Sequence, residues 1–527
     1  MRFKIQRKLG LRLLAVSLVA VGALTAAQAA SAAGKPNIVV IQSDDQTASQ
    51  FTPEVMPKTT ELLADHGTSF SDYIVTTALC CPSRASLITG QYAHNHGVLN
   101  NGRGGGYGAL IDKGNVLPVW LQQAGYNTIH VGKFMNAYGK AVADPAEVAP
   151  GWDDWQTLFS GDGRYYGYSL SNNGEVVQKG LANRDYVTRV ITRKAVGAVR
   201  RYAPDTKPFY LQVDHRAPHV ARGNRPGRCG GGTRAPEPDP ADLHMFRDAP
   251  LPRSRAFNEA NMTDKPAFLR SAPPLGYRDQ KHLKKHWSCA LASLVGVDRS
   301  VARVFNAVKK AGEIRKTVFI YISDNGQFFG EHRIFNGKVL PYEEALHEPL
   351  VIRMPKRYRS GAPRDDLSGE PAANIDLAPT ILDLAHGAPC PPGGQCRVMD
   401  GRSLMPLLSR SGSWPAKRGL LAEYRVSTPR SYATCDFAGI RTGNSIYVEH
   451  YSVVNLTTHN CDRTLQVERY NLKDDPKELQ NVCRGGLRTS CPPSHRQADL
   501  ERRLQLLRVC AGIKGRDQRV AGRPYCE

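Results

Sequence analysis

Long apolar runs are missing from the sequence after its first 33 residues, and so are internal repeats and low-complexity tracts. No later stretch is apolar enough to cross a bilayer, so no membrane span is expected in the rest of the chain. With 41% hydrophobic residues over 527 positions, the composition is not that of a disordered or fibrous chain. It predicts one large, enzyme-sized globular body with a smaller second domain.

Acidic residues are scarce relative to basic ones: 48 Asp and Glu stand against 70 Lys and Arg, for a net charge of +22. Such a charge attracts polyanions, which include nucleic acids, anionic surfaces and sulfated polysaccharides. A merely solubilising basic surface is the alternative explanation. No nucleic-acid-binding module is recognisable, so the charge alone does not predict a nucleic-acid partner.

The N-terminal segment has the pattern of a secretory signal peptide. Five basic residues and the apolar run LLAVSLVAVGALTAA precede the small residues AQAASAA, and no acidic residue occurs before residue 34. The apolar run is short for a membrane anchor. We therefore expect residues 1–33 to be cleaved off and the protein to be secreted.

Twelve cysteines raise the question of disulfides, because oxidising compartments retain them. Eight of the twelve follow residue 385, which suggests a cross-linked C-terminal part. Cys80 and Cys81 are adjacent and are followed by Pro82, so they either join this framework or one of them serves chemistry. If both stay outside it, the other ten suffice for five disulfides, whose pairing the sequence does not fix.

Two β-branched, almost wholly apolar runs predict buried strands at residues 36–43 (PNIVVIQS) and 316–323 (KTVFIYIS). Strands of this kind are buried on both faces, as in a parallel sheet between helices. Residues 295–312 have apolar side chains at helical spacing and end in Gly directly before the second strand. Further helices are predicted within residues 56–67, 115–125, 184–202 and 375–387. The alternation predicts an α/β sandwich around a mostly parallel sheet.

The character of the sequence changes twice along the chain. Residues 216–256 are rich in Pro, Gly and Arg and predict a long surface loop that borders the site. After about residue 410, short β-like segments alternate with turn residues and cysteines. We therefore predict a catalytic domain at 34–410 and a disulfide-rich C-terminal subdomain with an antiparallel sheet at 411–527.

Acidic and amide side chains follow both predicted strands. Asp44 and Asp45 end the first, and Asp324 and Asn325 end the second. Ligands of open α/β sheets bind at the carboxyl ends of the strands, where these groups would repel one another without a cation between them. All-oxygen ligands select a hard ion, and Ca²⁺ is expected before Mg²⁺ because the smaller octahedral shell of Mg²⁺ usually retains more water. Ordinary polar turns at two strand ends are the alternative.

The segment CCPSRASLITG, which begins at Cys80, fits the C-x-P-x-R…T-G signature of the type I sulfatases, and the chain resembles this family over nearly its whole length. The segments SDDQ, VGKFMNAYG, PGWDDW, APH, SDNG, GEHRIFNGKVLPYEE, DLAPTILDL, DGRSLMPLL and YNLKDDPKELQNV occur in family order. CCPSR with HNH after it, GKFMNAYG and RYYGYSL are most similar to N-acetylglucosamine-6-sulfatases and heparan 6-O-endosulfatases. The resemblance implies an alkaline-phosphatase-like fold and hydrolysis of sulfate esters, first of all those of sulfated carbohydrates.

The resemblance also implies that Cys80 is oxidised to Cα-formylglycine by a formylglycine-generating enzyme that recognises Pro82 and Arg84. The hydrated aldehyde would attack sulfur with one hydroxyl and release sulfate through the other, without water attacking sulfur. The residue made from Cys80 would share the divalent cation with the four oxygen ligands at the strand ends.

Other family positions imply roles for individual residues. Arg84 would hold the diol oxygen, and Lys133 and Lys338 would grip the sulfate. His219 in APH would donate a proton to the leaving oxygen.

The chain departs from many arylsulfatases at Met135, where they have a histidine, and the glucosamine-6-sulfatase group is also apolar there. His94 and His96 are candidate sugar-pocket residues, although a capped turn would explain them equally well. His332 is a candidate for indirect support of the site. Asp214 is assigned no role.

Three rival functions remain open at this stage. One is an arylsulfatase with a broad range of small substrates, and another is a phosphate or phosphonate monoester hydrolase on the same fold. The third is a noncatalytic, basic polysaccharide-binding protein. Relative rates on aryl sulfate and aryl phosphate would separate the two hydrolases, and an unmodified Cys80 would favour the binding protein.

Overall fold

The computed structural model describes most of the chain after residue 33. The described residues are 34–102, 105–139, 147–159, 163–222, 229, 235–359, 367, 370–409, 414–415, 417–426, 434–455, 458 and 460–527. The predicted signal peptide therefore lies outside the described residues. Within them, no helix combines the length and the apolar character that a bilayer crossing requires.

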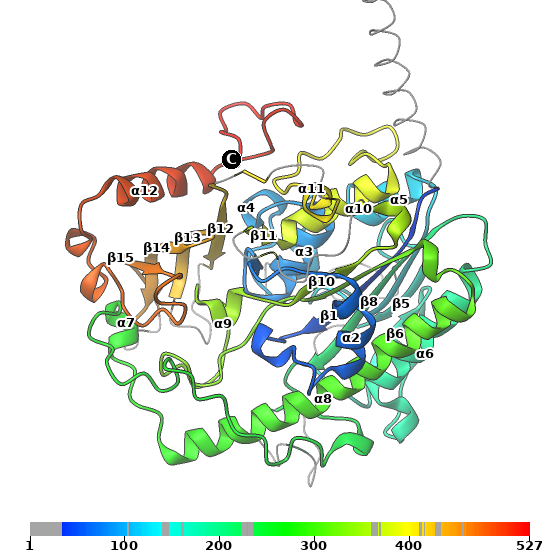
Figure 1. The fold of residues 1–527 in the computed structure, drawn as a ribbon, viewed down its shortest axis with the longest axis horizontal. Coiled ribbons are helices and arrows are strands. Elements are labelled where there is room, and N and C mark those ends of the chain that lie inside the picture. Colours follow the sequence, from blue (N-terminus) through cyan, green and yellow to red (C-terminus); the bar gives the residue numbers. More distant parts are fainter. Residues whose placement is uncertain are drawn as a thin grey trace, which may run out of the picture.

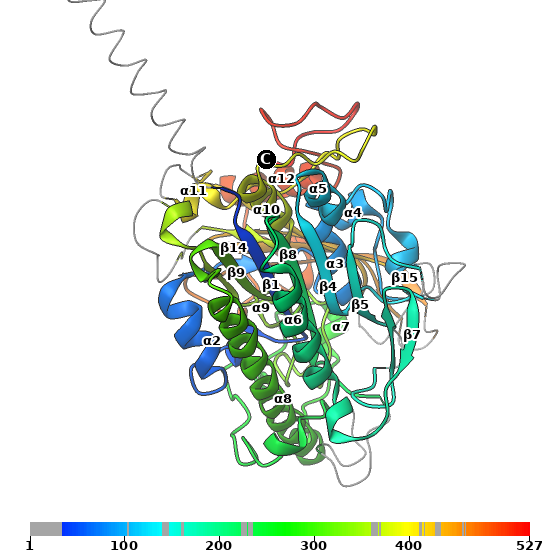
Figure 2. The same cartoon turned by 90° about the vertical axis from the view of Figure 1, so that its right-hand side faces the viewer.

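A nine-stranded, mostly parallel sheet forms the centre of the molecule (Figures 1 and 2). Its five inner strands, β9, β1, β8, β4 and β5, are parallel to one another, and antiparallel strands extend both edges. In spatial order the strands are β2 (Thr68–Ser69), β10 (Leu350–Arg353), β9 (Thr317–Ser323), β1 (Asn37–Asp44), β8 (Phe209–Pro218), β4 (Asn127–Lys133), β5 (Asp154–Leu158), β6 (Ser169–Asn172) and β7 (Glu175–Gln178). The two apolar runs expected to be strands are thus β1 and β9, neighbours in the sheet.

Helices cover both faces of this sheet. One face packs against α2 (Pro57–Leu62), α6 (Val187–Tyr202) and α8 (Tyr277–Lys310), and the other against α3 (Cys80–Thr89), α5 (Leu117–Gln123) and α10 (Leu377–Ala385). Side chains of β1 alternate between the two apolar cores: Val39 and Ile41 point to the first, Ile38 and Val40 to the second. The structure confirms the predicted α/β sandwich and the four shorter helices.

A second, antiparallel sheet follows in the sequence and lies beside the first body (Figure 1, β12 to β15). It contains β12 (Gly419–Arg425), β13 (Thr434–Thr442), β14 (Ser445–Val454) and β15 (Cys461–Asn471), and α12 (His495–Leu507) packs against β12 and β13. This is the antiparallel C-terminal sheet that the sequence predicts. Short elements complete the fold: β3 (Tyr73–Ile74) with β11 (Ala372–Ala373), and α4 (Ala93–His96), α7 (Ala267–Arg270), α9 (Glu343–Leu346) and α11 (Met405–Leu408).

Two boundaries differ from the prediction. The helix expected at 295–312 is the second half of α8, which begins at Tyr277 because Leu283, Trp287 and Leu291 extend its buried face under an otherwise basic stretch. The loop expected from residue 216 begins later, since β8 continues to Pro218. Residues 223–228 and 230–234 of that loop lie outside the described residues.

Five disulfides join ten of the twelve cysteines, all of which lie in the described part of the chain. The remaining two are Cys80 and Cys81, both buried thiols. Of the two possibilities that the sequence left open, the structure therefore has the one in which both adjacent cysteines stay outside the disulfide framework. The pairs are Cys229–Cys289, Cys390–Cys396, Cys435–Cys461, Cys483–Cys491 and Cys510–Cys526.

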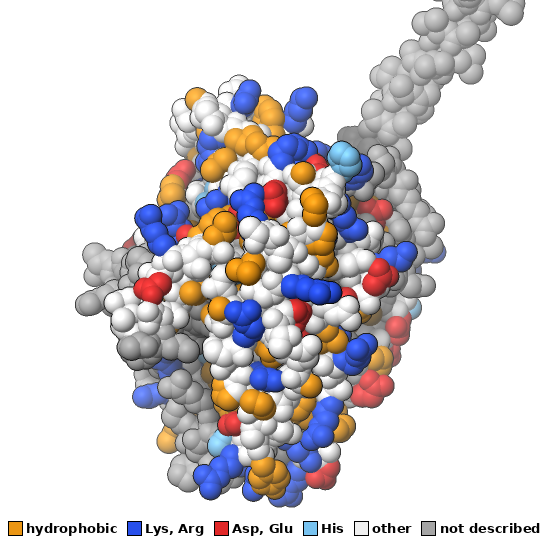
Figure 3. Space-filling view, turned by 90° about the vertical axis from the view of Figure 1, so that its left-hand side faces the viewer, with side chains coloured by type: hydrophobic (Ala, Val, Ile, Leu, Met, Phe, Trp, Pro, Cys, Tyr) orange, Lys and Arg blue, Asp and Glu red, His pale blue; other side chains and the backbone are white. Residues whose placement is uncertain are grey.

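Basic side chains are spread over the face of the molecule that lies at the left of Figure 1. In the space-filling view of that face, Lys and Arg are interspersed with hydrophobic and neutral atoms and do not gather in one patch (Figure 3). On this face, the positive charge does not by itself mark a polyanion site.

Candidate active site

The carboxyl ends of β1 and β9 bring four oxygen-bearing side chains together. Ser43 and Ser323 are opposite each other in the parallel register, so the residues that follow them meet at one edge of the sheet. The backbone N–H of Asp45 donates to Asp324 Oδ1 at 3.1 Å, and Asn325 Nδ2 donates to Asp45 Oδ1 at 2.7 Å. Asp44, Asp45, Asp324 and Asn325 are at most 4% exposed.

Asp45 has an unusual backbone conformation, with a positive φ of 68°. Such a conformation is unfavourable for a non-glycine residue and is concentrated at functional sites. Here it turns the chain sharply after the strand, so that Asp44 and Asp45 both belong to the cluster.

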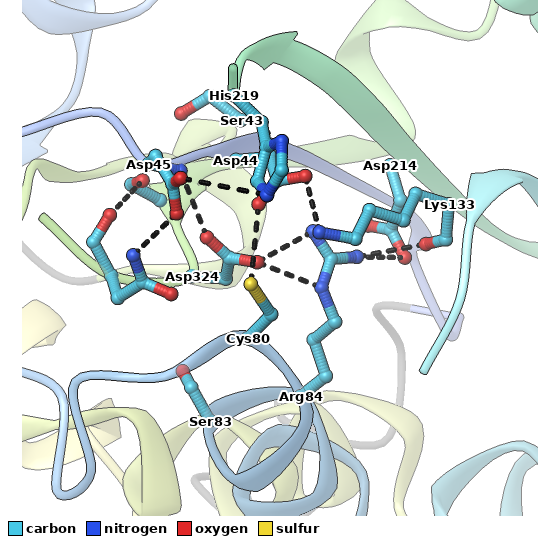
Figure 4. Close-up of polar contacts among 12 residues, drawn as sticks. Ser43, Asp44, Asp45, Cys80, Ser83, Arg84, Lys133, Asp214, His219 and Asp324 are labelled. Atoms are coloured by element: carbon cyan, nitrogen blue, oxygen red, sulfur yellow. Dashed lines mark hydrogen bonds and ion pairs between the residues drawn. The ribbon is translucent and has the colours of Figure 1, made fainter. Parts of the chain in front are cut away.

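Cys80 is the first residue of α3, and the N-terminus of this buried helix faces the carboxylates (Figure 4). Its Sγ lies 3.6 Å from Asp44 Oδ1 and 3.0 Å from Lys338 Nζ. The helix ends at Gly90, whose φ of 68° makes the left-handed turn that commonly ends a helix. A helix N-terminus carries partial positive charge, which favours anions at this point.

Arg84 follows Cys80 by one helical turn and points to the same cluster (Figure 4). Its Nε and Nη2 each lie 2.8 Å from Asp324 Oδ2. Nη1 donates to the backbone carbonyl of Lys133 at 2.8 Å and lies 3.3 Å from Asp214 Oδ2. Asp324, which follows β9, and Asp214 of β8 therefore hold opposite sides of one guanidinium.

Two lysines and a histidine complete the cluster. Lys133 Nζ, from the end of β4, contacts Asp44 Oδ2, and Lys338 Nζ contacts Asp45 Oδ1. His219 Nδ1 donates to the backbone carbonyl of Val220 at 2.7 Å, which leaves Nε2 facing the site, 3.8 Å from Asp45 Oδ2. Every residue expected to be catalytic or metal-binding thus lies in one cluster.

Burial and neighbouring charges shift the pKa values of the cluster. Burial alone would raise the pKa of Asp44, but the Lys133 ammonium lowers it to about 2. Lys338 likewise outweighs burial and lowers the pKa of Asp45. Burial raises the pKa of the Cys80 thiol to about 11, against the influence of both lysines. As an unmodified thiol, Cys80 stays protonated near neutral pH and is a poor nucleophile.

His94 and His96, the candidate sugar ligands, do not contact this cluster. His94 Nδ1 lies 2.9 Å from Glu423, and His96 is completely buried with Nε2 3.1 Å from Ser86 Oγ. Both side chains connect α4 to neighbouring elements, so we leave them out of the proposed site.

His332 belongs to a separate buried group of charges at the C-terminal sheet. Its Nδ1 lies 2.8 Å from Glu259 Oε2 and its Nε2 lies 3.7 Å from Glu344 Oε2. Although burial opposes it, these carboxylates raise the pKa of His332 to about 9. A protonated His332 therefore offsets part of the negative charge of the carboxylates around it. Met135, the position that departs from arylsulfatases, is fully buried in the apolar core.

Asp214 is the contact of the site that the sequence analysis missed. It lies near the end of β8, next to β1 in the sheet, and both of its neighbours in the sequence are buried as well. The signal in the sequence was its position shortly before APH, in a strand that ends at the site.

The cluster provides oxygen ligands for a hard cation, three cationic side chains for an anion and, among them, Cys80 as the side chain that could be chemically modified.

The sequence profile of the family described as Sulfatase matches residues 36–388. A second profile, described as N-sulphoglucosamine sulphohydrolase, C-terminal, matches residues 330–505.

Similar proteins include enzymes acting on different sulfate esters. An arylsulfatase of Volvox carteri is 34% identical over 94% of this chain and 78% of its own length. The human N-acetylglucosamine-6-sulfatase is 30% identical over 94% of this chain and 88% of its own. A putative extracellular sulfatase Sulf-1 homolog of Caenorhabditis elegans is 31% identical over 71% of this chain, which spans about half of that protein (49%).

Solved structures share the fold. A protein in complex with its substrate D-glucosamine-2-N,6-O-disulfate superposes with a TM-score of 0.66 at 24% identity, over 89% of this chain and 97% of that one. The phosphonate monoester hydrolase of Agrobacterium radiobacter superposes with a TM-score of 0.61 at 21% identity, over 85% and 92%. These likenesses support the alkaline-phosphatase-like sandwich.

Proposed function

Because this chain belongs to the sulfatase family and is thus a sulfuric ester hydrolase, we propose that it cleaves sulfate monoesters of sulfated sugars, with N-acetylglucosamine-6-sulfate units as the substrate class. The observation that carries the proposal is the meeting of Cys80, three carboxylates and two lysines at one point. The relatives that act on N-acetylglucosamine-6-sulfate cover nearly the whole chain, which supports this choice of sugar.

We further propose that Asp44, Asp45, Asp324 and Asn325, together with the residue formed from Cys80, hold one divalent cation. The fit is supported by the all-oxygen donor set and by the lysine ammonium groups, which already contact two of the carboxylates. Positive charge is therefore favoured at this position. Several protein ligands on one ion favour Ca²⁺ over Mg²⁺, which usually keeps more of its water. When bound, the ion would polarise the sulfate oxygens as a Lewis acid.

Cys80 is proposed to act only after oxidation to formylglycine by a formylglycine-generating enzyme. A thiol with a pKa of about 11 would give little thiolate, whereas a hydrated aldehyde supplies a hydroxyl nucleophile and a route for sulfate release. Arg84, held against Asp324, would keep its charge beside this group. That charge favours the deprotonated nucleophile.

The other cationic side chains would act on the ester itself. Lys133 at the end of β4 and Lys338 in the segment between β9 and α9 contact Asp44 and Asp45 beside Cys80. They would bind the sulfate oxygens and offset the charge that develops in the transition state. His219 Nε2 faces the cluster and would protonate the leaving oxygen. Burial lowers the pKa of His219, which makes its protonated ring a stronger acid.

We also propose that the protein acts outside the cell and has two parts. The five disulfides and the extracellular relatives support passage through the secretory pathway. A catalytic domain at 34–410 and a C-terminal subdomain at 411–527 agree with the separate antiparallel sheet that starts at Gly419.

The similarity to the Volvox enzyme favours a second candidate, an arylsulfatase of small substrates. Sulfate release from N-acetylglucosamine-6-sulfate and from an aryl sulfate, with an aryl phosphate as a third substrate, separates these functions. We expect the highest kcat/KM on the sugar. A higher kcat/KM on the aryl sulfate would favour the arylsulfatase over the sugar sulfatase. A higher kcat/KM on the aryl phosphate would reject both candidate functions.

The modification is tested on the same secreted protein. Mass spectrometry of the tryptic peptide from Thr59 to Arg84 should give the mass of –CHO in place of –CH2SH at Cys80. A Cys80→Ala variant should release no sulfate above background. An unmodified cysteine in a fully active preparation would contradict the proposal.

A further inference from the structure

We propose that Asp214 and His130 form a buried pair that positions the Arg84 guanidinium for sulfate ester hydrolysis. The inference rests on the proposed role of Arg84 and adds two positioning residues that do not themselves touch the substrate. The partners of Arg84 come from β4, from β8 and from the residue that follows β9.

The guanidinium of Arg84 is held on two sides by different carboxylates. Asp324 Oδ2 lies 2.8 Å from Arg84 Nε and 2.8 Å from Arg84 Nη2. Asp214 Oδ2 lies 3.3 Å from Nη1, which also donates to the Lys133 carbonyl at 2.8 Å. Asp324 is a proposed metal ligand, so Asp214 is the carboxylate partner of Arg84 that need not be shared with a cation. The position of Arg84 would therefore not depend on how Asp324 binds the metal.

Asp214 is itself fixed by side chains behind it. Its Oδ2 accepts a hydrogen bond from Gln212 Nε2 at 2.8 Å and lies 3.0 Å from His130 Nε2. Because a carboxylate accepts, His130 donates from Nε2, and Nδ1 is then free to accept from the Thr157 hydroxyl at 2.5 Å. One continuous chain of hydrogen bonds therefore runs from Thr157 through His130 and Asp214 toward Arg84.

The members of this chain lie on three adjacent parallel strands, β5, β4 and β8. Gly132 of β4 is opposite both Asp214 and Thr157 in the register. Gly132 has a φ of 117°, and a Cβ at this position would lie 2.0 Å from the Asp214 carbonyl oxygen. Glycine thus allows the close approach of strands on which the chain depends.

Aromatic rings prevent His130 from turning away. The ring centroids of Trp155, Trp152 and Phe134 lie 4.8, 5.3 and 5.4 Å from that of His130. His130 is completely buried and Asp214 is 1% exposed. Residues behind a functional group fix its orientation. In this way the rigid core of the sheet is connected to Arg84, beside the reacting group.

The test uses Asp214→Asn, which keeps the shape but removes the charge. We expect kcat per formylglycine-containing chain to fall by about 10- to 100-fold, the range for loss of an outer supporting carboxylate, with KM changed by less than about threefold. His130→Phe should lower kcat in the same direction. His130→Gln should lower kcat less than His130→Phe does, because the glutamine amide can still donate to Asp214.

A double variant tests the connection between the two residues. If His130 acts through Asp214, adding His130→Phe to Asp214→Asn should lower kcat no further. Additive losses would overturn the inference, and so would an Asp214→Asn enzyme with kcat within about twofold of the unmutated enzyme. Should Asp214→Asn fail to fold, the comparison of His130→Phe with His130→Gln decides: equal kcat values would overturn it.

Asp154→Asn is the matched control. Asp154 is another buried carboxylate of the same sheet; its side chain pairs with Arg201 at 3.2 Å and accepts from Gln156, neither of which belongs to the site. Its loss should lower stability while kcat per formylglycine stays unchanged. Formylglycine content, measured by mass spectrometry, separates a maturation defect from slower chemistry. If Cys80→Ala is as active as the unmutated enzyme, the proposed function fails, independently of the Asp214 result.

Discussion

Replacing His332 with Gln should remove a pH dependence of folding stability that the buried charges around it create. The pKa of His332 is raised to about 9, because Glu259 and Glu344 outweigh the effect of burial. In the unfolded chain the ordinary value of about 6.5 applies. Below pH 6.5 both states bind the proton and the stabilisation is fully present, and it is lost as the pH rises through about 9.

The size of the effect follows from the two pKa values. Each pKa unit corresponds to about 1.4 kcal/mol, so the rise from 6.5 to about 9 gives about 3 kcal/mol. Glu331 and Glu478 also face this group, and burial raises the pKa of both carboxyls, that of Glu331 to about 7. The His332 charge lowers the pKa of both carboxyls, so the comparison of the unmutated protein with His332→Gln measures the charge of His332 together with its effect on these two neighbours.

The assay is denaturant unfolding with intact disulfides at a series of pH values from 6 to 9.5. We expect the unmutated protein to lose about 3 kcal/mol more than His332→Gln over this range. His282→Gln, which changes an exposed histidine of α8, should follow the unmutated protein. Equal pH dependence of the unmutated protein and His332→Gln would refute the assignment of a charged His332.

Three further results are expected. Asp45→Ala should lower the bound metal, measured by elemental analysis, and should lower kcat by about 100-fold or more. Formylglycine should still form at Cys80. An undiminished metal content would remove Asp45 from the ligands. Cys81→Ala should cost about 1 kcal/mol of unfolding free energy, since its sulfur accepts one backbone N–H, and leave the Cys80 modification intact by mass spectrometry. Arg418→Met should cost about 3–5 kcal/mol by leaving Asp376 buried and unpaired, and a milder loss in the double variant with Asp376→Leu would confirm that cause.

The strands and the cluster at their ends could be predicted from local sequence for one physical reason. Buried parallel strands consist of continuous β-branched runs, and their carboxyl ends meet at one edge of the sheet. Asp44 and Asp324 could therefore be brought together without a structure. The metal and the modification of Cys80 remain predictions, since they depend on chemistry added to the chain.

Other features depended on long-range contacts that no local pattern encodes. The first half of α8 carries so many basic residues that its buried face is apparent only once Leu283 and Trp287 are packed. His94 and His96 resembled ligands in the sequence, but α4 directs them to Glu423 and Ser86. The pairing of the ten disulfide cysteines likewise followed from the fold alone.

The sequence by itself determined the α/β class, the residues at the strand ends and the signature that begins α3, because each depends on side-chain pattern over a few positions. Only the tertiary structure decided which charges share a partner. Asp214 and His130 lie on separate strands, far from Arg84 in the sequence, and become a unit because the parallel register brings β4 and β8 side by side. The burial that makes such contacts strong is a property of the assembled core and not of any one segment.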